Sequence, residues 1–358
     1  MKTYLVTGGA GFIGSNFIIH LLRRHDDIRV INLDKLTYAA NPRYLKPIEH
    51  DARYRFVQAD ICDRMAVREV LQSERIDYLV NFAAESHVDR SIVQPDVFIQ
   101  TNIEGVNVLL EEAKRAWQID EDTYQKGCRF LQVSTDEVYG TLGPTGRFTE
   151  HSPLNPRSPY SASKASADLL ARAYFETYRL PVNITRCSNN FGPGQYPEKL
   201  IPLMICKALT HQGLPVYGDG LQVRDWIYVE DHCRAVDHVL RMGKPGEIYN
   251  IGARSECANL QLVQWIVDYL HEQVDDTISR NLIAHVPDRK GHDRRYAVDP
   301  QKIERELGWS ATTNFTEAME KTIAWYVSHP EHCLKRYLDA QEERRGSAAD
   351  GSFPDDLP

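Results

Sequence analysis

Three glycines near the start of the chain limit the folds that it can adopt. Gly8, Gly11 and Gly14 are spaced by three in VTGGAGFIGSN, between an apolar run and a helix-length amphipathic stretch. Glycine lets the backbone turn sharply and approach a pyrophosphate, whose charge then lies at the helix N-terminus. A glycine triplet alone is also consistent with a simple tight turn. The flanking strand and helix favour a dinucleotide site, which would include Phe12 and Ile13.

The first half of the chain alternates short apolar runs with helix-length amphipathic stretches. Strands that are almost continuously apolar and separated by helices are typical of a parallel sheet covered on both faces. We therefore predict an α/β fold with a Rossmann-like, doubly wound parallel sheet and a smaller C-terminal substrate-binding region. Strands are expected at 3–9, 29–34, 54–60, 77–84, 128–135, 180–186 and 248–252, and helices at 12–24, 65–74, 95–117, 158–178, 199–211, 231–241 and 259–273.

Length and pattern divide the 358 residues into two regions. Residues 1–188 are expected to form mainly the dinucleotide-binding domain, with segments near 231–256 returning to it. Beyond Ser188 the loops become rich in Pro, Gly and Asn, so 189–330 is expected mainly to bind substrate. Residues 346–358 are small, polar and acidic, which predicts a disordered tail.

Bulk composition argues against several classes of protein. The formal net charge of -8 disfavours nucleic-acid binding, and no run of about 18 apolar residues could span a bilayer. The N-terminus lacks a secretory pattern, so we expect a cytoplasmic protein with neither nucleic acid nor membrane as partner. Seven scattered cysteines are interpreted as reduced thiols, and no metal site is predicted among them or the 13 histidines.

Asp34 ends the second expected strand, 20 residues after Gly14. A carboxylate there can accept hydrogen bonds from ribose hydroxyls and would repel a 2'-phosphate, so NAD is favoured over NADP as cofactor. The neighbouring Lys35 weakens that inference. Asp60 ends the third strand, where it could meet the adenine end of the dinucleotide or equally serve as a loop carboxylate or helix cap.

Tyr160 and Lys164 lie four residues apart at the start of an expected helix, so their side chains share one face. A nearby ammonium favours the phenolate, so we expect it to lower the pKa of Tyr160 from its usual value of about 10. The pair alone is also consistent with a surface helix. Following a dinucleotide fold, it indicates a redox base.

Two adjacent carboxylates, Asp136 and Glu137, follow the fifth expected strand. Neighbouring side chains of a regular strand point to opposite faces, so both could reach one ligand only if the strand ends at about Ser134 or Thr135. The sequence therefore predicts a turn, or the first turn of a helix, at this point. A helix cap formed by Thr135 or Asp136 is the simpler interpretation of the same residues.

In combination, these motifs resemble the extended short-chain dehydrogenases that act on nucleotide sugars, and within them the 4,6-dehydratases. The resemblance covers roughly residues 1–327 and rests on TGGAGFIGSN, LDKLTYA, FAAESHVDRS, STDEVYG, SPYSASKA, SNNFGP, EKLIP, VRDWIYVEDH and GHDRRYAVD. It implies an NAD-dependent lyase of deoxysugar biosynthesis, for example of rhamnose, that works as a homodimer. It also implies cofactor contacts from Leu36, Thr37, Ile61, Ala83, Ala84, Glu85, Ser86, Thr101 and Asn189.

The resemblance implies a role for each catalytic residue. Tyr160 would take the proton of the C4 hydroxyl of a dTDP-linked glucose while hydride passes to NAD, and Thr135 would donate a hydrogen bond near the C4 oxygen. Glu137 would then remove the C5 proton. Asp136 would protonate the departing C6 hydroxyl, because hydroxide is a poor leaving group. The elimination thus needs one base and one acid, and two carboxyl groups in opposite protonation states would supply them. Hydride would then return to C6.

Substrate contacts are expected from both regions. Thr135, His87 and Asn190 lie near the sugar by resemblance, although His87 is also consistent with a buried loop histidine. Arg224 suits a diphosphate because its planar fork makes paired hydrogen bonds, although a surface ion pair is the simpler interpretation without the motif. The remaining implied contacts are Lys199, Leu200, Pro215, Val216, Tyr217, Asn259, Asp288, Arg289, Lys290, Gly291 and His292.

Three positions depart from the family pattern. Lys290 stands where DRPGHD usually has proline, and Phe191 and Gly194 stand where tyrosine and a bulkier residue are common. The departure at Lys290 bears on the rigidity of its loop. The departures at Phe191 and Gly194 bear on fine substrate preference.

Three other functions share part of the pattern. A nucleotide-sugar 4-epimerase has the same fold and Tyr-Lys pair but needs no acid pair, and a GDP-mannose 4,6-dehydratase usually takes NADP. A noncatalytic dinucleotide sensor tends to lose the tyrosine or the lysine, and both are present here. The apolar faces of 95–117 and 158–178 fit packing on the sheet or, by resemblance, a bundle between two subunits.

Overall fold

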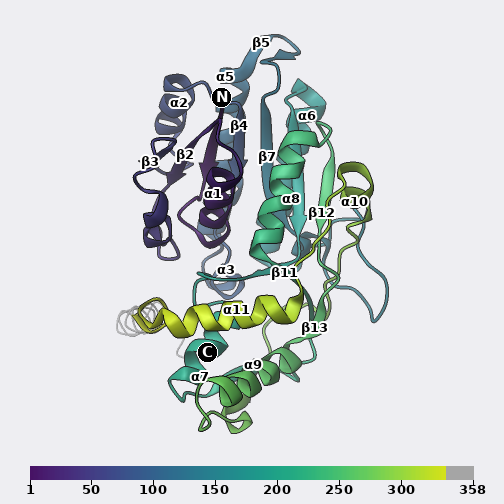
Figure 1. Ribbon diagram of the computed structural model, residues 1–358. Helices are drawn as coiled ribbons and strands as arrows, with labels where there is room; N and C mark the ends of the chain where they lie inside the picture. Colours follow the sequence, from purple (N-terminus) through teal and green to yellow (C-terminus); the bar gives the residue numbers. More distant parts are fainter. Residues whose placement is uncertain (336–358) are drawn as a thin grey trace.

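A seven-stranded parallel sheet forms the larger part of the molecule. The computed structural model describes residues 1–335 (Figure 1). The strand order is β12-β8-β7-β4-β1-β2-β3, which reverses direction between β1 and β4, where open α/β sheets place their ligand crevice. The predicted doubly wound sheet is therefore confirmed, including the return of β12. The strands are β1 (Lys2–Thr7), β2 (Ile28–Asp34), β3 (Tyr54–Gln58), β4 (Tyr78–Asn81), β7 (Arg129–Thr135), β8 (Val182–Cys187) and β12 (Ile248–Ile251).

Helices cover both faces of this sheet. Tyr4 and Val6 of β1 pack toward one group of helices, while Leu5 packs toward the other. This burial on both sides explains why the strands read as almost continuous apolar runs. The first group is α1 (Phe12–Arg24), α8 (Val229–Met242) and α10 (Gln301–Leu307), and the second is α2 (Arg64–Ser73), α5 (Gly105–Trp117) and α6 (Pro159–Tyr178).

The segment predicted as one helix over 95–117 contains a π-helical turn. α4 (Pro95–Ile99) is followed by the wider turn η2 (Gln100–Glu104) and then by α5. This turn carries the buried Asn102, whose Oδ1 accepts from the Glu85 amide (2.9 Å) and whose Nδ2 donates to the Glu85 carbonyl (3.0 Å). The prediction of an uninterrupted helix is wrong here, because the turn anchors the loop that follows β4.

A buried polar cluster joins α1 to α8. Asp237 of α8 lies 2.8 Å from His25 Nε2 and accepts a hydrogen bond of 2.9 Å from Arg241 Nε. Burial alone would raise the pKa of Asp237, but hydrogen bonds from His20, His25 and Arg241 outweigh it and hold the pKa below its usual range. The cluster therefore favours the ionised carboxylate in the folded state.

Residues beyond Ser188 build a second core, which lies below the sheet in Figure 1. It is surrounded by α7 (Leu200–Leu209), α9 (Asn259–Gln273) and α11 (Phe315–Ser328); α7 and α9 lie close to the expected helices, whereas α11 was not predicted. Its small sheets are β9 (Asn189–Phe191), β11 (Val223–Tyr228) and β13 (Glu256–Ala258), and the pair β10 (Leu214–Tyr217) and β14 (Ile283–Val286). Shorter elements are α3 (Val88–Val93), β5 (Gln118–Asp120), β6 (Thr123–Tyr124) and the helical turns η1 (Pro42–Ile48), η3 (Asp136–Tyr139), η4 (Arg280–Leu282) and η5 (Glu331–Lys335).

Two cysteines of the second core are joined. Cys206 of α7 and Cys333 of η5 form a disulfide, with their Cα atoms 5.6 Å apart. The interpretation of all seven cysteines as reduced thiols is therefore wrong for this pair. The fold brings together residues that are 127 positions apart, and no local spacing in the sequence signals the contact.

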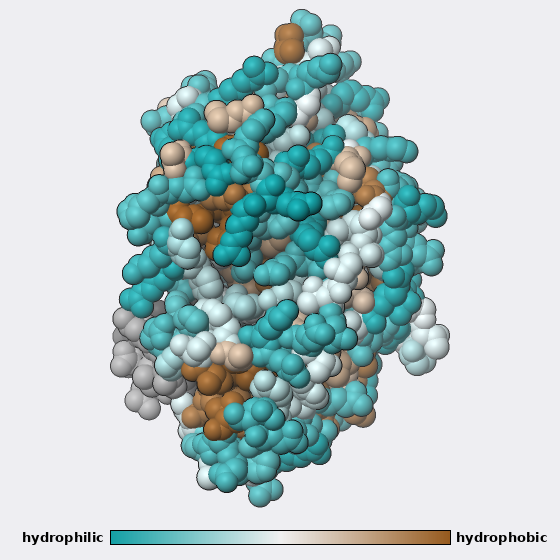
Figure 2. Space-filling view, in the orientation of Figure 1, coloured by the Kyte–Doolittle hydropathy of each residue, from teal (hydrophilic) through white to brown (hydrophobic). Residues whose placement is uncertain are grey.

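The molecular surface is mostly hydrophilic on the face shown in Figure 2, where apolar side chains gather in the upper and the lower half. Within residues 1–335, no helix combines the length and apolar character needed to cross a membrane. In the same part of the chain, no three His, Cys, Asp or Glu side chains are grouped in a way that could hold a metal ion. The predicted tail, 346–358, lies outside the described residues, and the boundary near residue 188 stays a prediction.

Candidate active site

The glycine-rich turn leaves room for a dinucleotide at the end of β1. Gly8 has a φ of +68°, and a Cβ added there would lie 2.5 Å from the amide nitrogen of Ala83. A Cβ on Gly14 would lie 2.3 Å from the carbonyl oxygen of Gly8. Because a side chain at either position would clash with backbone, the turn requires glycine and keeps the N-terminus of α1 open to a ligand.

Asp34 is held in place by backbone amides at the end of β2. Its Oδ2 accepts from Ala10 N and its Oδ1 from Leu36 N, each at 2.8 Å. Burial raises the pKa of Asp34, and the two amide hydrogen bonds oppose that rise. Lys35 turns instead to Asp60, with 2.6 Å between Nζ and Oδ2. Lys35 is thus paired with a different carboxylate and does not neutralise Asp34, whose role toward the ribose hydroxyls stays a prediction.

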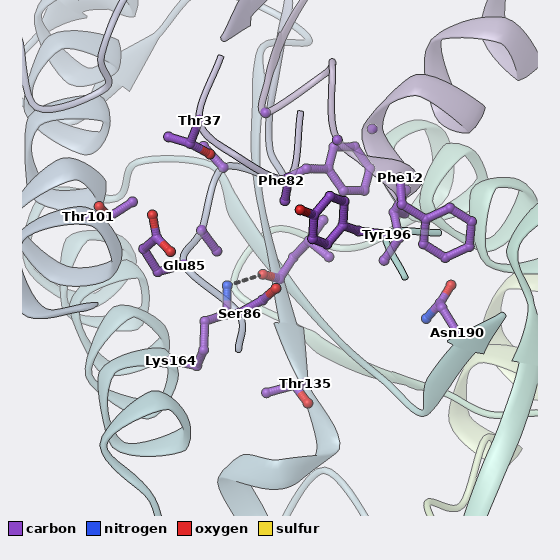
Figure 3. Close-up of a pocket in the computed structure, with 18 of the residues that line it drawn as sticks. Phe12, Thr37, Phe82, Glu85, Ser86, Thr101, Thr135, Lys164, Asn190 and Tyr196 are labelled. Atoms are coloured by element: carbon purple, nitrogen blue, oxygen red, sulfur yellow. Dashed lines mark hydrogen bonds between the residues drawn. The ribbon is translucent and has the colours of Figure 1, made fainter. Parts of the chain in front are cut away.

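A cavity at this edge of the sheet gathers the residues predicted to bind the cofactor. Figure 3 shows Glu85, Thr101 and Lys164 on one side of it and Phe12 and Tyr196 on the other. The predicted cofactor residues that line the cavity are Gly8, Gly11, Phe12, Ile13, Gly14, Asp34, Lys35, Thr37, Asp60, Ile61, Ala83, Ala84, Glu85, Ser86, Thr101, Tyr160, Lys164 and Asn189. Leu36 does not line it.

Unsatisfied polar atoms show that this cavity fits a polar ligand such as NAD. Ser188 Oγ and Asn189 Oδ1 are buried and have no hydrogen-bond partner among residues 1–335. Buried polar groups are nearly always paired, so both are suited to meet a bound molecule.

The acid pair lies where β7 ends. β7 stops at Thr135, and Asp136 and Glu137 occupy the short helical turn η3, as the geometry of two converging carboxylates requires. Thr135 Oγ1 also caps this turn by accepting from Glu137 N (3.3 Å). The prediction that the strand ends here is therefore confirmed, and the cap is part of the same arrangement.

The surroundings shift the pKa values of the two carboxyl groups by different causes. Burial, reinforced by Glu137 and Asp225, raises the pKa of Asp136 well above its usual range. Burial also raises the pKa of Glu137, but the cations Arg224, Arg289 and Lys199 oppose that rise. Asp136 is thus better suited than Glu137 to be the protonated acid, and Glu137 is the better suited of the two to be the base.

Tyr160 and Lys164 are both buried at the start of α6. Lys164 Nζ donates to the carbonyl of Val133 (2.7 Å). Burial, with the nearby Glu137, raises the pKa of Tyr160 well above its usual value, while a hydrogen bond with Thr135 opposes the rise. The pKa of Tyr160 is therefore raised in the protein alone and not lowered as expected, and burial lowers the pKa of Lys164 as well.

A buried arginine connects the helix of the redox base with the turn of the acid pair. Arg186 of β8 donates from Nε to Asp168 Oδ2 (2.9 Å), one turn beyond Lys164 on α6. It also donates from Nη1 to Tyr139 Oη (2.9 Å), which is the last residue of η3. The Tyr139 hydroxyl in turn donates to Asn250 Oδ1 (2.7 Å). These contacts fix the two parts of the site relative to each other.

A second cavity lies beside the first, and Glu137 lines both. Thr135 and Asn190 line the first cavity together with Lys199 and Leu200. The second is lined by the predicted residues His87, Lys199, Leu200, Pro215, Val216, Tyr217, Arg224, Asn259, Arg289 and Gly291. The residues predicted to bind substrate therefore adjoin those predicted to bind the cofactor.

Arg224 and Arg289 supply positive charge to the second cavity. Arg224 is buried and donates to the carbonyls of Val223 (2.9 Å) and Asp293 (3.0 Å), so it is not a surface ion pair. Arg289 makes two hydrogen bonds to Asp89, of 2.6 and 2.7 Å. The Arg224 charge suits a diphosphate, because its hydrogen bonds go to uncharged carbonyls.

Three predicted substrate residues line neither cavity. Asp288 Oδ1 lies 2.6 Å from Nδ1 of His292, and Asp288 Oδ2 accepts from Gln222 (3.2 Å). Lys290 is exposed. Roles for Asp288, Lys290 and His292 in substrate binding stay predictions.

Glu198 and Tyr196 line both cavities and were not predicted. The Tyr38 hydroxyl donates to Glu198 Oε1 (3.1 Å), and burial raises the pKa of Glu198. Lys199 Nζ donates instead to the Ser86 carbonyl (2.7 Å). A carboxylate directly before Lys199 in EKLIP was a usable signal for Glu198.

The fold and site together define a class of protein. A dinucleotide cavity that contains a Tyr-Lys pair and an acid pair adjoins a second cavity lined by Arg224 and Arg289. This combination describes an NAD-dependent enzyme of the extended short-chain dehydrogenase type that modifies nucleotide sugars.

Comparisons with known proteins narrow this class. Residues 5–322 match the model of a family described as GDP-mannose 4,6 dehydratase. A dTDP-glucose 4,6-dehydratase of Xanthomonas campestris pv. campestris is 52% identical over 332 residues, covering 92% of this chain and 94% of that protein. One from Neisseria meningitidis is 50% identical over 335 residues, covering 92% of this chain and 94% of that protein. The chain belongs to the dTDP-glucose 4,6-dehydratase family.

A solved structure agrees with this assignment. The dTDP-glucose 4,6-dehydratase DesIV of Streptomyces venezuelae, crystallised with NAD, superposes with a TM-score of 0.86 at 46% identity, covering 94% of this chain and 100% of that one.

Proposed function

We propose that the protein converts dTDP-glucose into dTDP-4-keto-6-deoxyglucose by removing water across C5 and C6. The observation that carries this proposal is the pair Asp136 and Glu137 beside Tyr160, where the pKa of Asp136 is raised well above its usual range while three cations oppose the rise at Glu137. A 4-epimerase needs no second acid and base. Curated relatives named dTDP-glucose 4,6-dehydratase support the same substrate.

Each residue then has one task. Tyr160 accepts the proton of the C4 hydroxyl, and Thr135 donates a hydrogen bond to the C4 oxygen. When bound in the first cavity, NAD would accept the C4 hydride and later return it to C6. Glu137 removes the C5 proton, which the C4 ketone makes acidic, and Asp136 protonates the departing C6 hydroxyl. Proton transfer back to C5 completes the cycle.

The substrate's diphosphate is assigned to the second cavity. Arg224 there is buried without a carboxylate hydrogen-bond partner, and a planar guanidinium forms paired hydrogen bonds with phosphate oxygens. Pro215, Val216 and Tyr217 of β10, with Asn259 at the start of α9, would surround the base. The departure at Phe191 lies outside this assignment, because its ring packs against Trp226, Tyr228 and Phe315 in the core.

The protein is further proposed to act as a cytoplasmic homodimer. Exposed apolar side chains of α3, α4 and α6 support a second copy as the partner: Ile92, Ile99 and Leu169 are 37%, 47% and 59% exposed. Three large apolar side chains in water on neighbouring helices favour an interface.

Incubation with dTDP-glucose in heavy water tests the proposed reaction. We expect a sugar nucleotide that has lost one water and carries solvent deuterium at C5. An unchanged covalent structure with inverted C4 would instead establish an epimerase. Binding of NAD without conversion of any nucleotide sugar would establish a noncatalytic sensor. Conversion of another nucleotide sugar alone would keep the reaction but refute the assignment of dTDP-glucose and of the base-binding residues.

A further inference from the structure

Gly194 faces a tyrosine from a distant part of the chain. Its φ is +88°, and a Cβ added there would lie 1.7 Å from Tyr44 Cζ and 1.8 Å from Tyr44 Oη. The space that a side chain at position 194 would need is therefore filled by the Tyr44 ring. This accounts for the small residue at a position where the family commonly has a bulkier one.

The other side of the Tyr44 ring lies against the C-terminal part of the described chain. It stacks on Trp325 of α11, with centroids 5.5 Å apart and planes at 22°, and the His332 ring lies at 5.6 Å. Trp325 in turn stacks on His329 at 4.5 Å. The disulfide next to His332 ties this aromatic cluster to α7. Tyr44 is thus enclosed between Gly194 and a well-anchored surface.

Tyr44 belongs to η1, which directly follows the cofactor loop, residues 35–41. Thr37, Ala39 and Ala40 of this loop line the dinucleotide cavity. The loop ends at Asn41, whose amide donates to Ala10 O in the glycine-rich turn (2.7 Å) and whose Nδ2 lies 3.2 Å from His332 Nδ1. A displacement of Tyr44 would therefore move the loop that lines the dinucleotide cavity.

Gly194 belongs to the segment of residues 189–199, which comprises β9 and the loop that follows it and is here called the facing loop; this segment lines the same cavity through Asn190, Gln195 and Tyr196. The two loops also meet where the Tyr38 and Tyr196 rings lie edge to face at 5.4 Å. The facing loop is also anchored to α11, because the Tyr326 hydroxyl donates to Gln195 O (2.7 Å). The two walls of the cavity are thus joined at Tyr44 and Gly194.

We propose that Tyr44 and Gly194 form a latch that holds the cofactor loop against the facing loop and slows release of the dinucleotide. The inference rests on the proposed function only in that a dinucleotide occupies the cavity. It assigns Tyr44 a positioning role, acting through residues 37–41 and never touching the reacting atoms. A reaction that returns its hydride to the same substrate has no need to release the cofactor at each turnover, so a latch is compatible with turnover.

The test measures how fast the holoenzyme exchanges bound NAD for isotopically labelled NAD. Tyr44→Ala and Gly194→Ala should each release NAD about tenfold faster or more, the effect expected for loss of a packed aromatic contact. Gly146→Ala is the matched control, because Gly146 has a φ of +87° but nothing within 4 Å of an added Cβ. It imposes the same backbone strain without the clash and should leave exchange unchanged.

The double variant separates the clash from backbone strain. With Tyr44→Ala in place, the added methyl at position 194 has room, so Gly194→Ala should accelerate exchange no further. Wild-type exchange in a folded Tyr44→Ala variant, or an equal extra acceleration by Gly194→Ala in both backgrounds, would overturn the latch. NAD exchange that follows this pattern in a protein that does not dehydrate dTDP-glucose would leave the latch intact and refute only the proposed function. A purified protein that binds no NAD would refute both.

Discussion

Replacing Asp136 by asparagine tests the division of labour within the acid pair. Asp136 is 2% exposed, and burial together with Glu137 raises its pKa, which favours the neutral acid as the group that is replaced. Asparagine has nearly the same shape, adds no buried charge and can keep the contact with Thr135 Oγ1. It has no proton to give to the departing C6 hydroxyl. The fold should therefore survive while one chemical step is lost.

The size of the effect follows from the role of the residue. A positioned general acid contributes about 10²–10⁴-fold to its step, so loss of water should slow by that factor. Oxidation at C4 depends on Tyr160 and Thr135, which remain, and should change by less than about tenfold.

Single-turnover mixing with dTDP-glucose in heavy water distinguishes the two steps. We expect the absorbance of NADH to rise and persist in Asp136→Asn, because hydride cannot return to C6 before water leaves. Glu137 can still exchange the C5 hydrogen, so recovered sugar should carry deuterium at C5. Glu137→Gln is the matched variant, which should also accumulate NADH but without deuterium at C5.

The reasoning fails if both variants lose water at the wild-type rate. It also fails if Asp136→Asn abolishes exchange at C5 while Glu137→Gln retains it, since the roles of base and acid would then be reversed. Loss of NADH formation in Asp136→Asn would show that the carboxyl group is needed for the first oxidation.

Three further predictions concern the framework of the site. Arg186→Met should lower the free energy of unfolding in urea by about 3–5 kcal/mol, because it leaves the buried Asp168 without its cationic partner. Adding Asp168→Leu to this variant should recover at least half of that loss. No recovery would contradict a stabilising buried pair. The hydrogen bonds that lower the pKa of Asp237 contribute stability above its unfolded pKa of about 4 and lose it as pH falls through the lower folded value. Asp237→Asn should therefore be less stable by about 1–3 kcal/mol at neutral pH, with a weaker dependence on acid in thermal melts, and an unchanged dependence would refute this role. Alkylation in denaturant without reductant should label five of the seven cysteines, and labelling of all seven would refute the Cys206–Cys333 disulfide.

The strand ends could be predicted from the sequence because their causes are local. Period and steric reasoning placed the end of β7 at about Ser134 or Thr135, and the strand ends at Thr135; the apolar run RVINLD placed Asp34 at the end of β2. The π-helical turn at 100–104 could not be predicted, since a helix pattern does not show that Asn102 will bond to a loop 17 residues earlier.

The substrate loop shows the limit of a motif. DRKGHD lies beside the second cavity, yet only Arg289 and Gly291 of its predicted residues line that cavity. The orientation of the others depends on how the loop packs, and Gly291, with a φ of +68°, approaches the Arg157 carbonyl so closely that a Cβ would lie 2.8 Å from it. Contacts of this kind form only in the folded chain, so a linear pattern cannot say which side chains face the ligand.

The catalytic groups share one electrostatic property that explains the order of the proposed reaction. Burial raises the pKa of Tyr160, Asp136 and Glu137 and lowers that of Lys164, so the protein drives all four toward their neutral forms. A neutral acid is what the leaving hydroxyl needs, and Glu137 is pulled back toward ionisation by three cations. Lys164 does not offset the raised pKa of Tyr160, because burial also favours the neutral form of Lys164. When NAD+ is bound, its positively charged nicotinamide would add to the Thr135 hydrogen bond in favouring the phenolate, which would tie deprotonation of the sugar to the form of the cofactor that can accept its hydride.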